Sequence, residues 1–158
     1  MPSLKELKAR KRSDYPYILE YRTRWSDNDM YAHMNNAMYT VLYDAVINTY
    51  LVEACGMRPH HSPQHALVVH SQIDYFGSIS FPKVAELALR VARLGHSSVT
   101  YDVALFEKGV DEVRSVGEFV QVFVERETGR PNAATGMSAA YKEGLEKILV
   151  QGDAKSKI

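Results

Sequence analysis

A change in the spacing of apolar residues, from helical to alternating, constrains the fold of this chain more than any other feature. From Asn36 apolar side chains recur every three or four residues until Gly56, which predicts one long helix of about 20 residues. Over residues 66–127 they alternate instead, with breaks that each contain a glycine, which predicts four strands. Strands joined by short turns pair antiparallel, so we expect an α+β fold rather than a doubly wound parallel sheet.

Two further segments complete the predicted architecture. Residues 17–25 alternate in the same way and predict a strand before the helix, whereas residues 138–150 have helical propensity and predict a second helix. We therefore expect a single domain over residues 15–150, in which a curved antiparallel sheet of about five strands wraps the long central helix. Residues 1–14 and 151–158 are expected to be flexible tails.

Composition narrows the functional classes. The 158 residues include 19 basic and 19 acidic side chains, so net charge favours neither nucleic acid nor membrane as a partner. One cysteine cannot form an internal disulfide, and no apolar run is long enough to cross a bilayer, so we expect a cytoplasmic protein. Ser156-Lys157-Ile158 differs from the peroxisomal signal Ser-Lys-Leu only in its last residue, so a peroxisomal address and a polar tail both stay open.

The segment between the first strand and the long helix is the most informative for function. It contains Asp27 and Asp29 in a polar turn, then His33, then the adjacent Asn35 and Asn36. A run this rich in turn formers ends the strand, and either asparagine can cap the helix. The turn is therefore expected to fold back over the start of the helix.

Such a loop offers what hydrolysis of a thioester requires. The attacking water needs a base, and the carbonyl oxygen needs fixed positive dipoles where negative charge develops. Asp29 can hold a water or attack directly, so its roles as base and as nucleophile both stay open. The backbone N–H of Asn36, at the positive end of the helix, is the candidate oxyanion donor.

Residues 25–39 resemble the 4-hydroxybenzoyl-CoA thioesterase family of hotdog proteins. They fill every fixed position of its D-x-D-x-x-x-H-x-N-N-x-x-Y pattern, and residues 94–98 and 124–131 resemble its Gly-x-Ser-Ser junction and its closing strand. The resemblance covers residues 17–132 and implies a hotdog fold, an acyl-CoA substrate and a homodimer or homotetramer that hides a sheet edge. It implies no metal and no redox cofactor, because coenzyme A enters as part of the substrate.

The same resemblance implies roles for single residues. Asp29 becomes the catalytic carboxylate, Asn36 at the helix start the oxyanion donor, and His33 steadies the loop or the thioester carbonyl. Asp27 is expected to organise the turn. The residues that would contact the substrate or its coenzyme A part are Asn35, Tyr39, Ser97 and Ser98.

Structural interpretations of these residues stay open beside the functional ones. Asp27 and Asp29 can bond their own turn, helix capping accounts for the two asparagines, and Ser97 and Ser98 suit a turn at a strand edge. His33 can be an ordinary hydrogen-bonded loop histidine.

Other functions are also considered. The chain can be an acyl-CoA or fatty-acyl binding protein without turnover, or a hotdog hydratase, although the interval from Asp29 to His33 is one residue shorter than the hydratase spacing. A zinc site is disfavoured, because no cysteine or acidic pair completes a ligand set. That site would use His60, His61, His65 and His70.

Overall fold

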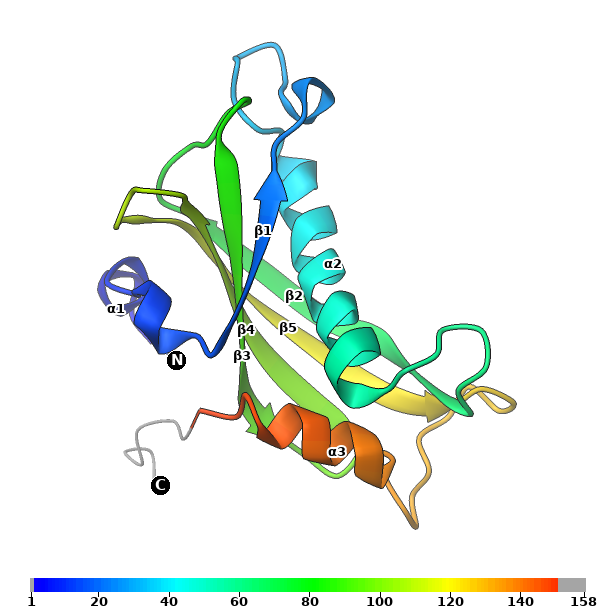
Figure 1. The fold of residues 1–158 in the computed structure, drawn as a ribbon. Coiled ribbons are helices and arrows are strands. Elements are labelled where there is room, and N and C mark those ends of the chain that lie inside the picture. The colour runs from blue at the N-terminus through cyan, green and yellow to red at the C-terminus, as the bar shows by residue number, and fades with distance from the viewer. Residues whose placement is uncertain (1, 151–158) are drawn as a thin grey trace. The chain divides into compact units, whose positions relative to one another are not determined.

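The computed structural model describes residues 2–150, and its elements follow the order predicted from the sequence (Figure 1). The elements are α1 (Leu4–Lys8), η1 (Arg12–Asp14), β1 (Tyr17–Arg22), η2 (Trp25–Asp27), α2 (Asn36–Cys55), β2 (Gln64–Tyr75), β3 (Val84–Leu94), β4 (Ser98–Glu107), β5 (Val113–Glu125) and α3 (Ala139–Glu146).

The strands form one five-stranded sheet in the order β1-β3-β4-β5-β2. β1 pairs antiparallel with β3, from Tyr17 opposite Leu89 to Arg22 opposite Val84. β3, β4 and β5 follow one another through tight turns, as antiparallel neighbours do. Together with the 20-residue helix α2, this sheet confirms the predicted α+β class.

The chain divides into two compact units. The first unit comprises Met1–Ile47, Gln72–Leu89 and Val103–Gly117, and the second comprises Asn48–Ser71, Arg90–Asp102 and Glu118–Ile158.

In the first unit, the N-terminal half of α2 supplies a row of apolar side chains to the core. Its inward side chains are almost fully buried, as the helical spacing of apolar residues predicts. They are Tyr39, Leu42, Tyr43, Val46 and Ile47.

Residues 1–14 of the same unit differ from the expected flexible tail, because α1 and η1 lie there. Ser3 caps α1 in a capping box. Arg12 pairs with Glu86 of β3, and its guanidinium lies 4.8 Å from the centre of the Phe106 ring. A local cap and one long side chain that reaches the sheet therefore order a segment whose composition resembles a tail.

In the second unit, α3 packs against the C-terminal half of α2. The Tyr50 hydroxyl donates a hydrogen bond to the Gly144 carbonyl at 2.7 Å. A Cβ added at Gly144 would lie only 2.5 Å from the Cys55 sulfur, so the two helices approach closely at this glycine. α3 confirms the helix predicted after Ser138, although it ends at Glu146.

Three further predictions concern membrane spans, the C-terminal tail and the domain organisation. Within residues 2–150 no helix is long and apolar enough to span a membrane. The predicted tail 151–158, including Ser156-Lys157-Ile158, lies outside the described residues. The single-domain organisation over residues 15–150 stays a prediction.

Candidate functional site

β1 ends at Arg22, earlier than the expected end at Trp25, because Asp27 turns the chain. The Asp27 side chain is fully buried. Its Oδ2 accepts hydrogen bonds from the Arg24 N–H at 2.7 Å and the Tyr21 hydroxyl at 2.8 Å, and its Oδ1 accepts from the Arg24 guanidinium. Burial raises the pKa of Asp27, but these hydrogen bonds outweigh it and leave the pKa below its ordinary value.

The following residues form a closed loop that carries Asp29 and His33. Asn28 and Met34 face each other as an isolated antiparallel bridge. The Asp29 N–H donates to the His33 carbonyl at 2.8 Å, and the Ala32 N–H donates to the Asp29 carbonyl at 3.1 Å. Ala32 has a φ of 59°, a left-handed conformation that lets the chain reverse.

The Asp29 carboxylate has one engaged oxygen and one available oxygen. Oδ1 accepts a hydrogen bond from the Tyr31 N–H at 2.8 Å, which is the turn role considered from the sequence. Within residues 2–150 no group donates to Oδ2. Asp29 therefore stabilises its loop while it keeps an oxygen that can hold a water.

The start of α2 leaves one backbone donor unused. Asn35 precedes the helix, and its Oδ1 accepts from the Ala37 N–H at 2.9 Å. The Asn35 carbonyl accepts from the Met38 N–H, also at 2.9 Å. Among the described residues, none accepts from the Asn36 N–H, so this dipole stays available at the positive end of the helix.

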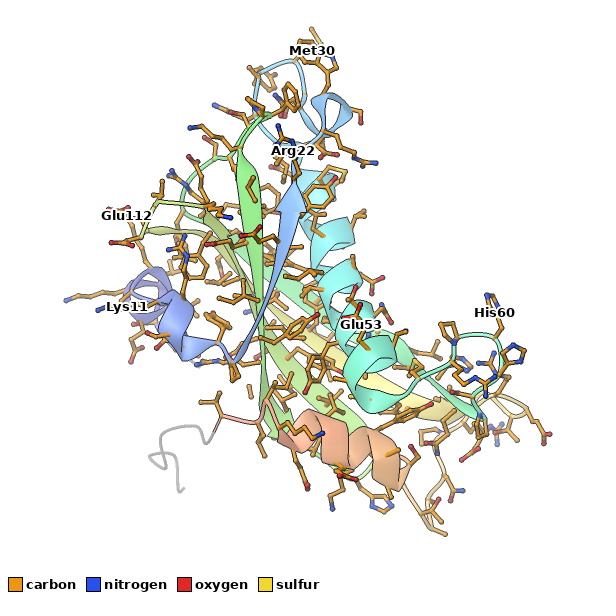
Figure 2. The ribbon with its side chains drawn as sticks, viewed as in Figure 1. Lys11, Arg22, Met30, Glu53, His60 and Glu112 are labelled. Carbon is orange, nitrogen blue, oxygen red and sulfur yellow. The ribbon has the colours of Figure 1, made fainter. Side chains whose placement is uncertain are left out.

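A cavity of about 470 Å³ brings the predicted catalytic residues together. Its lining residues all belong to the first unit, and the loop that supplies several of them also carries the fully exposed Met30 (Figure 2). Three of its walls come from the loop, the first turns of α2 and the segment after β2. The lining residues are Asp29, Tyr31, His33, Met34, Asn36, Tyr39, Tyr75, Gly77 and Ser78.

Sequence reasoning missed Tyr75, Gly77 and Ser78, which reach the cavity from the end of β2. The Tyr75 ring contacts Tyr39 edge to face, with centroids 5.1 Å apart. Burial raises the pKa of both phenols, so they form a neutral wall. The sequence places Tyr75 near a strand end, but it does not show which strand end meets the helix start.

The predicted substrate contacts Ser97 and Ser98 lie in the second unit, at the turn between β3 and β4, and do not line this cavity. The Ser97 carbonyl accepts from the Phe123 N–H at 2.8 Å. A Cβ added at Gly95 would lie 2.6 Å from the Ser98 hydroxyl, so the turn is closely packed. A substrate contact by these serines stays a prediction.

The histidines of the second unit do not gather into a ligand set. Across residues 2–150 no group of three or more histidine, cysteine, aspartate or glutamate side chains is placed to hold a metal ion.

Comparisons with known proteins identify relatives of the fold. The model of the thioesterase-like superfamily matches residues 23–145. The structure of the PA5185 protein from Pseudomonas aeruginosa is 41% identical, with a TM-score of 0.84, and the match covers 92% of this chain and 98% of that one. No curated protein matches the sequence.

Two more distant structures share the fold. A Thermus thermophilus thioesterase, solved with coenzyme A and Zn, is 23% identical with a TM-score of 0.69, covering 85% of this chain and 95% of that one. A 1,4-dihydroxy-2-naphthoyl-CoA thioesterase from Synechocystis is 10% identical with a TM-score of 0.71, covering 84% and 96%.

Proposed function

The chain belongs to the thioesterase-like superfamily and has its hotdog fold, and from this premise we propose that it hydrolyses an acyl-CoA thioester to a free acid and coenzyme A. The 4-hydroxybenzoyl-CoA thioesterase family, whose motif residues 25–39 resemble, is the finer family within this proposal. The Thermus thermophilus structure solved with coenzyme A and Zn is also named a thioesterase, which supports a coenzyme A thioester as the substrate.

One observation carries the proposal. A single cavity is lined by Asp29, whose carboxylate has an available oxygen, and by Asn36, whose N–H has no acceptor among the described residues. These are the two groups that thioester hydrolysis requires, one for the nucleophile and one for the oxyanion. Exposed His33 lines the same cavity and can orient the carbonyl.

The reaction follows from this arrangement. Asp29 either takes a proton from a water that attacks the carbonyl carbon, or attacks that carbon itself to form an acyl-aspartyl anhydride, which water hydrolyses after the thiolate has left. In both cases the oxyanion develops where the helix dipole and the Asn36 N–H favour negative charge. The C–S bond then breaks, and the thiolate of coenzyme A leaves and takes up a proton.

Substrate contacts are proposed from the same geometry. Tyr39 and Tyr75 form an apolar wall on which the acyl group can pack. The Asn35 side chain is engaged as the helix cap, so its proposed contribution is to hold the helix start in place. No metal or redox cofactor takes part in the proposed reaction.

We also propose that the protein forms a homodimer or homotetramer through the edge of its sheet. β2 lies at one edge of the strand order and is 12 residues long. Three adjacent apolar residues on it are exposed, and an edge of this kind is usually paired or covered. They are Leu67 (45%), Val68 (46%) and Val69 (62%).

The proposed location is cytoplasmic. A reporter that carries the ten C-terminal residues tests the alternative: punctate import would support a peroxisomal address, and diffuse fluorescence would exclude it.

A panel of coenzyme A thioesters tests the proposed function. Aromatic, short-chain and long-chain acyl-CoAs are incubated with the protein, and release of free thiol is measured. If the wild-type protein hydrolyses any of these thioesters and Asp29→Asn does not, the proposal is supported. Tight binding without thiol release would instead identify an acyl-CoA binding protein, and hydration of an enoyl-CoA would identify a hydratase.

A further inference from the structure

Asp27 connects the end of β1 to the start of α2, and we propose that it is a positioning residue for the oxyanion donor, acting through Tyr21, Arg24 and Asn35. It touches no residue of the cavity lining through its carboxylate, so it acts through its neighbours rather than on the substrate. This inference rests on the proposed function, because the donor that it positions is the Asn36 N–H.

The carboxylate of Asp27 is hydrogen-bonded to the end of β1 and to the residues that follow it. Oδ2 receives the hydroxyl of Tyr21, a residue of β1, together with the backbone N–H of Arg24. Oδ1 receives two guanidinium nitrogens of Arg24, at 3.0 and 3.2 Å. Both oxygens therefore accept two donors each, and the side chain is 0% exposed, so water cannot replace a lost partner.

The backbone carbonyl of Asp27 is hydrogen-bonded to the residue that precedes α2. The Asp27 carbonyl accepts from the Asn35 N–H at 2.8 Å. Asn35 in turn caps α2 through the Ala37 N–H, which leaves the Asn36 N–H between two fixed neighbours. One buried residue thus joins the last part of β1 to the peptide group that would receive the oxyanion; Figure 2 labels Arg22, the last residue of β1, and Met30 in the loop that follows.

An amide cannot replace this carboxylate. Asparagine has one acceptor oxygen, and its NH₂ group would face donors at the other position, either the Tyr21 hydroxyl and Arg24 N–H or the guanidinium. Asp27→Asn therefore breaks one half of the network and lets the helix start shift relative to Asp29. Shifts of about 1 Å in a catalytic group can lower turnover by about a hundredfold.

The experiment compares Asp27→Asn with a matched variant, Asp102→Asn. Asp102, whose side chain is 20% exposed, is likewise a carboxylate paired with an arginine, since Arg90 donates to it at 2.7 and 2.9 Å, but it lies in the second unit and lines no part of the cavity. Both variants are assayed at a temperature where circular dichroism shows them folded. Tyr21→Phe is the second variant for the network, because it removes one hydrogen bond without leaving a buried charge unpaired.

We expect Asp27→Asn to lower kcat by about tenfold or more with KM within about threefold of wild type, and Tyr21→Phe to lower it by less. Asp102→Asn should keep kcat within about twofold of wild type. A wild-type kcat in folded Asp27→Asn, or an equal loss in Asp102→Asn, would overturn the inference. If Asp27→Asn does not fold, Tyr21→Phe decides: an unchanged kcat overturns it.

A second readout separates this inference from the proposed function. Amide hydrogen exchange at Asn35 and Ala37, whose N–H groups are hydrogen-bonded at the helix start, should become faster by about tenfold or more in Asp27→Asn and stay unchanged in Asp102→Asn. If the wild-type protein hydrolyses no thioester, the proposed function fails, yet this exchange still decides whether Asp27 positions the helix start. Unchanged exchange at both amides would refute that positioning.

Discussion

The Asp29 carboxylate combines a turn bond with an available oxygen, since Oδ1 accepts from the Tyr31 N–H and no described group donates to Oδ2. Asp29→Asn keeps the turn, because the amide oxygen can accept the same N–H, but it removes the base or nucleophile. Hydrolysis should therefore fall by about a hundredfold or more, with thioester binding largely retained. Thiol release and substrate binding by calorimetry measure the two effects separately.

The control for Asp29→Asn is its thermal stability. A melting temperature close to wild type shows that the turn is intact, so any loss of rate belongs to the chemistry. Asp27→Asn should lower the rate by about tenfold, which is less than the loss in Asp29→Asn. Near-full turnover by folded Asp29→Asn would show that Asp29 is only a turn residue.

The lowered pKa of Asp27 links the stability of the fold to pH. Burial is the largest single effect and raises that pKa, but the hydrogen bonds from Arg24 and Tyr21 together lower it below the ordinary aspartate value. The stabilisation is therefore fully present above about pH 4, the unfolded-state value, and is lost as pH falls through the lower folded-state pKa. Asp27→Asn should be less stable than wild type at pH 7, and the difference should shrink in acid.

Urea unfolding of both proteins at pH 7 and at successively lower pH measures this difference. Asp102→Asn controls for the loss of an arginine partner elsewhere in the chain. A difference between wild type and Asp27→Asn that stays constant down to strongly acidic pH would show that the Asp27 charge does not contribute.

At the scale of elements, Gly144 determines how closely α3 approaches α2. A Cβ at this position would lie 2.5 Å from the Cys55 sulfur and 3.0 Å from the Ala54 carbonyl oxygen. Gly144→Ala should therefore destabilise the protein by about 1–3 kcal/mol through overpacking, despite the better helix propensity of alanine. Chemical denaturation measures the loss.

Adding Cys55→Ala provides the control for Gly144→Ala. Removing the sulfur relieves the shortest contact but leaves the backbone contact, so the double variant should lose less than the sum of the single losses. The buried Cys55 thiol, whose pKa burial raises to about 11, stays neutral in this test. Strictly additive losses would show that the two residues do not meet.

Elements with a strong local pattern could be predicted from the sequence, whereas their ends could not. The periodicity of α2, β3, β4 and β5 identified them, because one face of each is buried. β1 ends early because the chain turns around the buried carboxylate of Asp27. The N-terminal segment is ordered because Arg12 pairs with Glu86, which is far away in the sequence. Such tertiary contacts leave no periodic signal.

In the site, too, residues of a local motif could be predicted, whereas residues brought in by tertiary contacts could not. Asp29, His33 and Asn36 could be predicted together, because they belong to one short motif and line one cavity. Tyr75 and Ser78 reach that cavity from the region after β2, and no local pattern relates that region to the helix start. The hydrogen bond from Tyr21 to Asp27 was missed for a related reason, since an alternating strand gives no sign that one hydroxyl has a buried partner.

At the scale of the whole molecule, the two sides of the sheet differ in how their edges are covered. β1 pairs with β3 only as far as Leu89, and beyond it Val91 of β3 exchanges hydrogen bonds with the C-terminal segment, from its N–H to the Ile148 carbonyl and from the Val150 N–H to its own carbonyl. β2, at the end of the strand order, has β5 on one side only. Its exposed Leu67, Val68 and Val69 suit pairing with β2 of a second copy, which would bury them.

A charged β2 edge should therefore separate the subunits. The wild-type protein is expected to have at least twice the 17.9 kDa chain mass by light scattering at micromolar concentration. Val68→Lys combined with Val69→Lys places like charges opposite each other across a two-fold pairing of β2, so this variant should be monomeric. Val41→Lys, at a valine that is also exposed but lies on α2, should keep the wild-type mass. A monomeric wild-type protein would exclude the oligomer. A β2 variant that keeps the oligomer mass would place the interface elsewhere, because its two substitutions alter only the sheet edge.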